Sequence, residues 1–219
     1  MMSLRAVATL ATVTIILNAT TTYAQDIPGR WIVGIKGGSG FLPDEIVRRT
    51  DGKPGPIVSG TIAYSPIDLF SLGINIEWEA HKLEPGVSGN FTTVSLIPFT
   101  EIRLNVSRVF IPYASLGVGI NINSQTDARI KSCIGSFVGP GFAIFPCNLE
   151  PDNSFALKVG GGIDYYISEA LALNTEIAWK MNAGDAELCV EGSGCPGTVD
   201  FDANVFMILF GIRYYFDKK

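Results

Sequence analysis

The stretch that decides the fold is Pro112-Tyr-Ala-Ser-Leu-Gly-Val-Gly-Ile-Asn-Ile-Asn123. From Ala114 to Ile122 every second residue is apolar, and the residues between them are serine, glycine or asparagine. A period of two residues predicts a β-strand with one apolar and one polar face. A strand of about ten residues is longer than most strands of globular proteins and can cross a bilayer when tilted.

The same alternation recurs along the chain and predicts an all-β protein. Seven further strands are expected, at residues 31–38, 57–64, 71–79, 91–105, 154–166, 171–180 and 202–216. The connections alternate between long and short, beginning and ending with a long one. This alternation predicts an eight-stranded antiparallel up-and-down barrel, with four long loops at one end and three short turns and both termini at the other. Pro98 lies inside the fourth strand and predicts a bulge or distortion, because proline donates no ladder hydrogen bond.

The distribution of small and aromatic residues indicates which face of the barrel is inside. A soluble lipocalin-like barrel also alternates, but its apolar face lines the cavity. Here the polar face carries glycines that suit a narrow interior, namely Gly34, Gly73, Gly117, Gly119, Gly160, Gly162 and Gly211. The apolar face carries aromatic residues toward the strand ends, as in membrane girdles, namely Trp31, Trp78, Tyr165, Trp179, Tyr214 and Phe216. The sequence therefore predicts a transmembrane barrel with its apolar face outward.

This orientation places ten charged residues in the lumen. They are Lys36, Glu77, Glu79, Glu101, Arg103, Lys158, Asp164, Glu176, Lys180 and Arg213. The two signs are equal in number, and buried charges need partners or water. Because an eight-stranded barrel is just wide enough for side chains to fill it, we expect a cross-linked polar core. Such a core argues against a wide pore and leaves room for a thin water path.

The N-terminus predicts export. Arg5 precedes an apolar run at residues 6–17, and Thr22-Tyr-Ala24 provides small residues before Gln25. These features are typical of a signal peptide at residues 1–24, followed by a barrel domain at residues 25–219. The alternative, a membrane anchor, is disfavoured because the apolar run is shorter than the ~20 residues of a spanning helix. The formal net charge of −5 and the absence of a basic block disfavour nucleic acid as a partner.

The four cysteines of an exported chain predict disulfides. Cys133, Cys147, Cys189 and Cys195 allow three pairings. Bonds between sequence neighbours, Cys133–Cys147 and Cys189–Cys195, would constrain the third and fourth long loops separately. Either crossed pairing would link the two loops covalently. The cysteine spacing resembles no zinc pattern, and no other metal or cofactor is expected. We expect no enzyme, because the only histidine, His81, falls in a predicted loop as a solvated side chain without an aligned triad.

The third long loop is the best candidate contact surface. It holds an apolar run that includes Phe137, Phe142, Ile144 and Phe145. One interpretation is that this run folds over the barrel mouth and buries itself. The other is that it contacts a host molecule or another envelope protein. For the whole protein, a structural or surface-interaction role and a narrow channel for small solutes both stay open, and the balanced lumen charges favour the first.

Three segments resemble a known family. They are Ile111-Pro-Tyr-Ala-Ser-Leu-Gly-Val-Gly-Ile120, Lys158-Val-Gly-Gly-Gly-Ile-Asp-Tyr-Tyr-Ile167 with the following Leu171-Ala-Leu-Asn-Thr-Glu176, and Gly211-Ile-Arg-Tyr-Tyr-Phe216. In order and spacing they are similar to the eight-stranded outer-membrane β-barrel family, which includes OmpA-, OmpX- and OmpW-like proteins and opacity-like surface antigens. The resemblance implies a location in the bacterial outer membrane. It also implies contact with lipid, lipopolysaccharide and the barrel-assembly machinery. Asp217-Lys-Lys219 departs from the family pattern, in which an aromatic residue often ends the chain.

Overall fold

The strands form a single closed sheet. The computed structural model describes residues 29–42, 51–84, 87–104, 106–107, 109–134, 144–190 and 194–216. These residues contain eleven strands: β1 (Arg30–Phe41), β2 (Asp51–Gly52), β3 (Gly55–Ile67), β4 (Phe70–Glu84), β5 (Val87–Arg103), β6 (Phe110–Ile134), β7 (Ile144–Pro151), β8 (Ser154–Tyr166), β9 (Leu171–Val190), β10 (Gly194–Asp202) and β11 (Val205–Phe216). None of the described segments is a helix that could cross a membrane.

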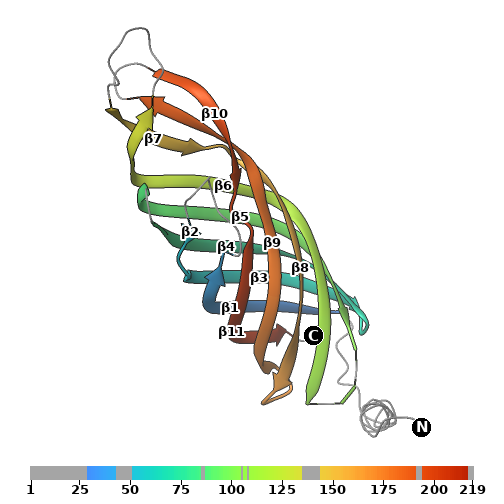
Figure 1. The fold of residues 1–219 in the computed structure, drawn as a ribbon. Helices are drawn as coiled ribbons and strands as arrows, with labels where there is room; N and C mark the ends of the chain where they lie inside the picture. Colours follow the sequence, from blue (N-terminus) through green and yellow to red (C-terminus); the bar gives the residue numbers. More distant parts are fainter. Residues whose placement is uncertain are drawn as a thin grey trace, which may run out of the picture.

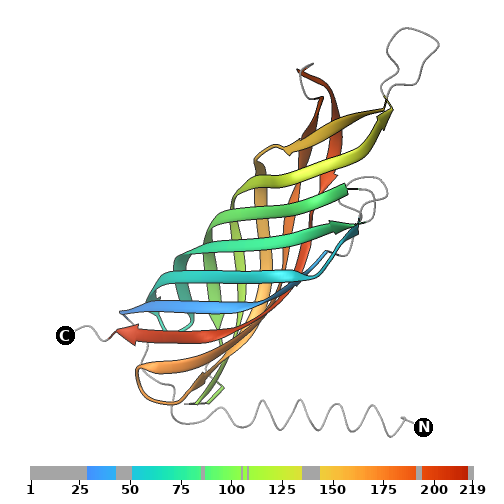
Figure 2. The ribbon, with the colours of Figure 1, turned by 90° about the vertical axis from the view of Figure 1, so that its left-hand side faces the viewer.

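Eight of these strands are the staves of a barrel (Figures 1 and 2). Going round, β1, β3, β4, β5, β6, β8, β9 and β11 each pair antiparallel with the next. Closure comes from β1 and β11, which pair from Trp31 with Phe216 to Phe41 with Phe206. The predicted eight-stranded up-and-down barrel is confirmed. We call the end with the short turns and the C-terminal Phe216 the turn end, and the opposite end the loop end.

The strands run further at the loop end than the sequence pattern indicates. β4 and β5 continue to Glu84 and from Val87 through a segment expected to be a loop. β6 extends to Ile134 and β9 to Val190, again beyond the predicted strand ends. Two-residue periodicity requires one face in lipid and one in the lumen. Beyond the lipid-facing belt that pattern weakens while backbone pairing continues.

The extra length builds a sheet that stands above the barrel on one side. Its four strands are neighbours in the order β6, β7, β9 and β10. Figure 1 shows β7 and β10 at the far end of the molecule from the short turns, with Figure 2 giving the side view. We call residues 124–134, 144–151, 183–190 and 194–202 the projecting sheet. Two predicted long loops are therefore largely strand.

The outer surface of the barrel is apolar, as predicted. On β6, Leu116, Val118 and Ile120 are about half exposed, at 52%, 49% and 51%. On every stave the alternate positions point outward in the same way, and they include Trp31, Ile35, Ile76, Trp78, Phe155, Ile177, Phe210 and Phe216. Exposed apolar residues that surround a closed barrel form a belt suited to lipid. Aromatic contacts occur in the belt at the turn end, where Trp31 lies beside Tyr64 and Tyr214 beside Phe216.

Pro98 is accommodated without a bulge. β5 keeps one register with β4 through the pair Ile74–Pro98. On the other side it pairs with β6 at Leu96 and again at Phe99, with the same register on both sides of the gap. The expected distortion is therefore a local gap in one ladder. Pro98 lies on the outer face, where its ring meets lipid.

The glycines of β6 make room for apolar neighbours and for close backbone approach. A Cβ atom on Gly117 would lie 2.6 Å from Cγ2 of Ile97, and one on Gly119 would lie 2.0 Å from the carbonyl oxygen of Leu96. The nearest atoms therefore belong to β5. At this level β5 turns the apolar side chains of Ile97 and Phe99 into the lumen, and the small glycines of β6 leave room for them.

Two glycine-to-alanine substitutions should separate this effect from strand propensity. Gly119→Ala is expected to lower the free energy of unfolding by about 1–3 kcal/mol, because the methyl group overlaps the backbone of Leu96. Gly60→Ala is the matched control, since nothing lies within 4 Å of the Cβ position at Gly60. Urea unfolding of both variants in lipid vesicles measures the difference. Equal stability of the two variants would contradict the close contact.

Candidate functional site: the barrel lumen and the projecting sheet

Four charged residues form a compact cluster in the lumen near the turn end. The turn-end cluster consists of Glu101, Arg103, Asp164 and Arg213, all almost fully buried. Asp164 Oδ2 accepts hydrogen bonds from Arg103 at 2.5 Å and from Arg213 at 3.1 Å. Arg213 also donates to both oxygens of Glu101, at 3.0 and 2.9 Å. Two cations and two anions therefore neutralise one another away from water.

The other six lumen charges form a second neutral cluster further toward the loop end. The central cluster consists of Lys36, Glu77, Glu79, Lys158, Glu176 and Lys180, and each is buried. Lys158 bridges Glu77 and Glu176, the latter at 2.7 Å, and Lys36 also pairs with Glu176. Lys180 lies 3.1 Å from Glu79 and donates to Ser95 at 2.8 Å. All ten charges singled out in the sequence are thus inside and paired.

Uncharged polar side chains join the two clusters and extend them. The Tyr113 hydroxyl lies 3.2 Å from Glu176 and receives a hydrogen bond from Asn174 at 2.9 Å. Asn174 in turn donates to Asp164 at 2.7 Å. Closer to the loop end, Asn123 and Asn182 exchange amide hydrogen bonds at 2.9 and 3.1 Å. The polar network therefore runs along most of the lumen.

Apolar side chains pack inside the lumen toward both ends. At the turn end a buried group packs across the interior, consisting of Ile32, Ala63, Phe99, Ile111, Tyr166, Ala172 and Tyr215. Toward the loop end a second group contains Ile57, Ala178, Val205, Met207 and Leu209. Phe91 of β5 and Phe201 of β10 also meet there, with ring centroids 5.1 Å apart.

A few buried polar atoms in and beside the central cluster lack a hydrogen-bond partner. They include Glu77 Oε2 and Glu79 Oε2 of the cluster and Nε2 of the neighbouring His81. Glu79 Oε2 and His81 Nε2 face each other at 3.9 Å, too far apart for a hydrogen bond. Buried acceptors of this kind are places where ordered water lies in many proteins. Among the described side chains, no three of histidine, cysteine, aspartate or glutamate are placed to hold a metal ion.

His81 is a lumen residue and the prediction of a solvated loop histidine is wrong. It lies on β4 and is only 1% exposed. Its Nδ1 lies 3.2 Å from the carbonyl oxygen of Lys53. A Cβ atom on Gly40 or Gly55 would lie 3.1 or 2.9 Å from the ring, so the two glycines make the space that it fills. The prediction failed because Pro85 and Gly86 suggested an earlier end to the strand.

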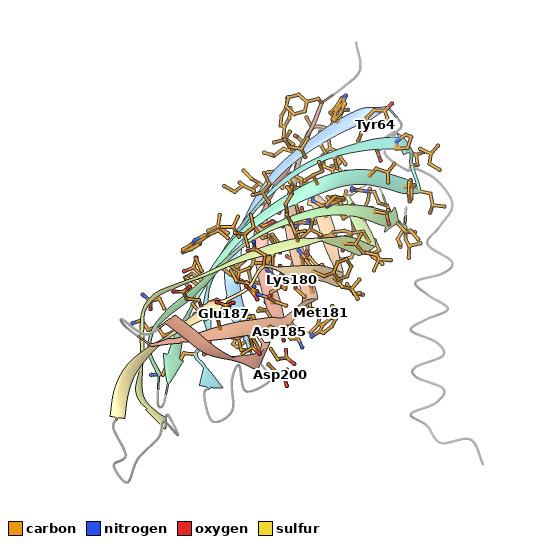
Figure 3. All side chains as sticks on the ribbon, turned by 90° about the horizontal axis from the view of Figure 1, so that it is seen from above. Tyr64, Lys180, Met181, Asp185, Glu187 and Asp200 are labelled. Carbon is orange, nitrogen blue, oxygen red and sulfur yellow. The ribbon has the colours of Figure 1, made fainter. Side chains whose placement is uncertain are left out.

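The outer face of the projecting sheet is acidic. Glu150 lies directly opposite Glu187, and Asp185 directly opposite Asp200, and all four are exposed. In Figure 3 the labelled Asp185, Glu187 and Asp200 lie together, away from Tyr64 near the turn end. Like charges directly opposite in a sheet are destabilising. Their position places them above the belt, since Met181 and Trp179 precede them on the same face of β9.

The remaining candidates from the sequence fall partly outside the described residues. Phe137 and Phe142 lie outside them, as does the predicted signal peptide at residues 1–24. Ile144 and Phe145 begin β7, but their side chains are not among those described. The cysteines stand on four different strands, Cys133 on β6, Cys147 on β7, Cys189 on β9 and Cys195 on β10.

Several lumen residues escaped the sequence analysis. Tyr215 donates to Asp164 at 2.6 Å and accepts from Arg103 at 2.7 Å. Tyr113 and Asn174 connect the two charged clusters. The signal was present, because all three stand on the polar face of their strands. Attention to charge alone passed over hydroxyl and amide groups that satisfy the same partners.

Comparison with solved structures identifies the class of protein. The crystal structure of the outer membrane protein OprG from Pseudomonas aeruginosa is similar over 88% of this chain and 98% of its own, with a TM-score of 0.61 and 14% identity. Neisserial surface protein A matches 86% of this chain and 97% of its own, with a TM-score of 0.53 and 12% identity. The outer membrane protein AlkL matches 90% and 95%, with a TM-score of 0.50 and 14% identity. No protein-family model and no curated protein matches the sequence.

The chain therefore has the fold of small bacterial outer-membrane β-barrels. Identities this low show a shared architecture and no more. The apolar belt independently requires a membrane, and closed barrels of this kind are the form in which strands cross outer membranes. The predicted fold and outer-membrane location are both confirmed. In such barrels the turn end faces the periplasm and the loop end faces outward.

Proposed function

We propose that this protein is a structural or surface-interaction barrel of the outer membrane whose projecting sheet presents the contact surface. The observation that carries the proposal is the filled lumen. Two neutral charge clusters occupy its middle, and buried apolar groups pack toward both ends. A barrel with this interior supplies an anchor. The part of the chain able to meet a partner is then the sheet beyond the belt.

The environment of the projecting sheet supports this role. It rises on one side of the barrel and ends in the segments 135–143 and 191–193, which join β6 to β7 and β9 to β10. Its neighbours would be lipopolysaccharide and a host molecule or another envelope protein. Insertion of the barrel would need the assembly machinery that handles such folds. The proposal assigns no catalysis to the chain, because the sole histidine is buried and held by the Lys53 carbonyl.

A narrow channel for small solutes is the second candidate. It is favoured by the buried acceptors Glu77 Oε2, Glu79 Oε2 and His81 Nε2, which have no hydrogen-bond partner and would suit a hydrated path. This path would have to pass the apolar groups at both ends, including Phe91 and Phe201. The structural role needs no such passage.

Liposome swelling discriminates between the two functions. Proteoliposomes that contain the full-length mature protein are diluted into isosmotic arabinose or sucrose, and swelling is followed by light scattering. We expect the proteoliposomes to swell no faster than protein-free liposomes, because the lumen is filled. A general porin in the same lipid is the positive control. Swelling that rises with the amount of this protein would favour the channel and contradict the structural role.

A further inference from the structure

The projecting sheet places one cysteine on each of four neighbouring strands. In the sheet order β6, β7, β9 and β10 these are Cys133, Cys147, Cys189 and Cys195. Adjacent strands lie about 4.8 Å apart, so positions separated by one intervening strand are about 10 Å apart. A disulfide joins Cα atoms no more than about 6.8 Å apart. Each bond must therefore connect neighbouring strands.

Only one of the three pairings meets this condition twice. Joining Cys133 to Cys189 crosses β7, and joining Cys147 to Cys195 crosses β9. Joining Cys133 to Cys195 crosses both β7 and β9. The pairing of Cys133 with Cys147 and of Cys189 with Cys195 connects neighbours in both cases.

The strand register supports the same conclusion. On β7 and β9, Cys147 is opposite Val190 and Cys189 is opposite Asn148. The two cysteine positions are therefore one residue out of register, and such positions lie on opposite faces of a sheet. This difference in face disfavours a bond between Cys147 and Cys189, the one other pair of cysteines on neighbouring strands.

Within each hairpin the two cysteines stand on strands that pair directly with each other. Gly194 is opposite Val190 in an antiparallel pair. In the same register the next position on β10, Cys195, is opposite the preceding position on β9, Cys189. Cys133 is opposite Phe145, two residues from Cys147 on β7, which makes Cys133 and Cys147 diagonal neighbours. A register shift between Ile130 and Cys133 adds one residue to β6 at this point.

We propose that the mature protein carries the disulfides Cys133–Cys147 and Cys189–Cys195, one in each hairpin of the projecting sheet. Each bond forms by thiol–disulfide exchange with a disulfide-bearing oxidase of the envelope. A cysteine thiolate attacks the donor disulfide and releases one donor thiol. The second cysteine then attacks the mixed disulfide and releases the other. The chain loses two hydrogens per bond, and the donor is reduced to its dithiol.

The role that we give these two bonds rests on the proposed function, in which the projecting sheet presents the contact surface. Each hairpin tip is closed by its own covalent bond, so each presents a separate constrained loop. Among the described residues, the two hairpins are joined by the backbone pairing of β7 with β9, from Cys147 with Val190 to Pro151 with Ala186. In the chain-entropy account, each bond stabilises its hairpin by removing conformational freedom from the unfolded chain. The sequences of the two contact loops can therefore vary while the backbone pairing of β7 with β9 that carries both hairpins is kept.

Tryptic mapping without reduction tests the proposal. Cleavage after Lys131, Lys158, Lys180 and Arg213 puts Cys133 and Cys147 on peptide 132–158, and Cys189 and Cys195 on peptide 181–213. The full-length protein is extracted from outer membranes, alkylated and digested. We expect two separate peptides, each lighter by two hydrogens than after reduction and neither alkylated. Peptides 132–158 and 181–213 found as one linked species would overturn the proposal, and so would alkylation of all four cysteines.

Two single substitutions test the pairing without relying on the relative amounts of the recovered peptides. In Cys195→Ser, alkylation is expected at Cys189 alone, with peptide 132–158 still lighter by two hydrogens. In Cys133→Ser, alkylation is expected at Cys147 alone. Any exchange of these outcomes would contradict the pairing. The measurement does not depend on solute flux, so a failure of the disulfide assignment can be told apart from a failure of the structural role.

Discussion

Replacing Asp164 by asparagine is expected to lower the free energy of unfolding by about 3–5 kcal/mol, the usual cost of breaking a buried ion pair. The substitution removes one charge and hardly changes the volume. Asp164 is the only acceptor shared by Arg103, Arg213 and Tyr215 in the turn-end cluster, and it also accepts from Asn174. Without its charge, two arginines are left in the lumen with Glu101 as their one anionic partner.

Urea unfolding in lipid vesicles, followed by tryptophan fluorescence, measures this effect. Asp185→Asn is the matched control, since Asp185 is exposed and faces Asp200. We expect a change within about 0.5 kcal/mol there, as for most surface substitutions. The double variant Asp164→Asn/Arg213→Met restores the neutrality of the cluster. Its loss of unfolding free energy should be smaller than the sum of the losses in the two single variants. A similar small change at positions 164 and 185 would show that the cluster is hydrated rather than buried.

A charge placed on the belt should have the second largest effect. Ile177 stands midway along the outward positions of β9, between Leu171 and Met181, and is 51% exposed. Ile177→Arg is expected to lower the free energy of unfolding by about 2–4 kcal/mol, because arginine would lie near the middle of the bilayer. The substitution distinguishes a lipid-facing surface from a water-facing one, on which arginine costs little.

Depth along the same strand provides the control. Met181→Arg lies on the same face of β9, two residues beyond Trp179 and next to the acidic part of the projecting sheet. Its expected cost is about 0–1 kcal/mol, because arginine there reaches the interface. Unfolding in lipid vesicles and the mobility of unheated samples on gels both report the difference. Equal costs at 177 and 181 would contradict the position of the belt.

Within the bilayer, the residue pattern was enough to predict the fold. Each stave separates a lipid face from a lumen face, so Leu116, Val118 and Ile120 alternate with Gly117 and Gly119. The same alternation assigned Arg103 and Asp164 to the lumen, although nothing in it pairs one with the other. Their pairing depends on the stagger of strands distant in the sequence, which only the closed barrel fixes.

Outside the bilayer the sequence was less informative. Residues 124–134 and 183–190 pair as strands, but both faces of the projecting sheet lie beyond the belt and the period of two is lost. His81 was misplaced for a related reason, since the loop was expected to follow residue 79 whereas β4 continues to Glu84. The sequence pattern also did not show which side chains the glycines of β6 accommodate, because Ile97 and Phe99 interrupt the polar face of β5.

The central claim is that the lumen is filled from end to end, so that function lies at the surface. Single-channel recording of the full-length protein in planar bilayers tests it most directly. With the charge clusters paired and apolar side chains packed toward both ends, we expect a baseline without stable openings over a wide range of voltages. Stable conductance steps in the nanosiemens range, proportional to the amount of folded protein, would contradict the claim.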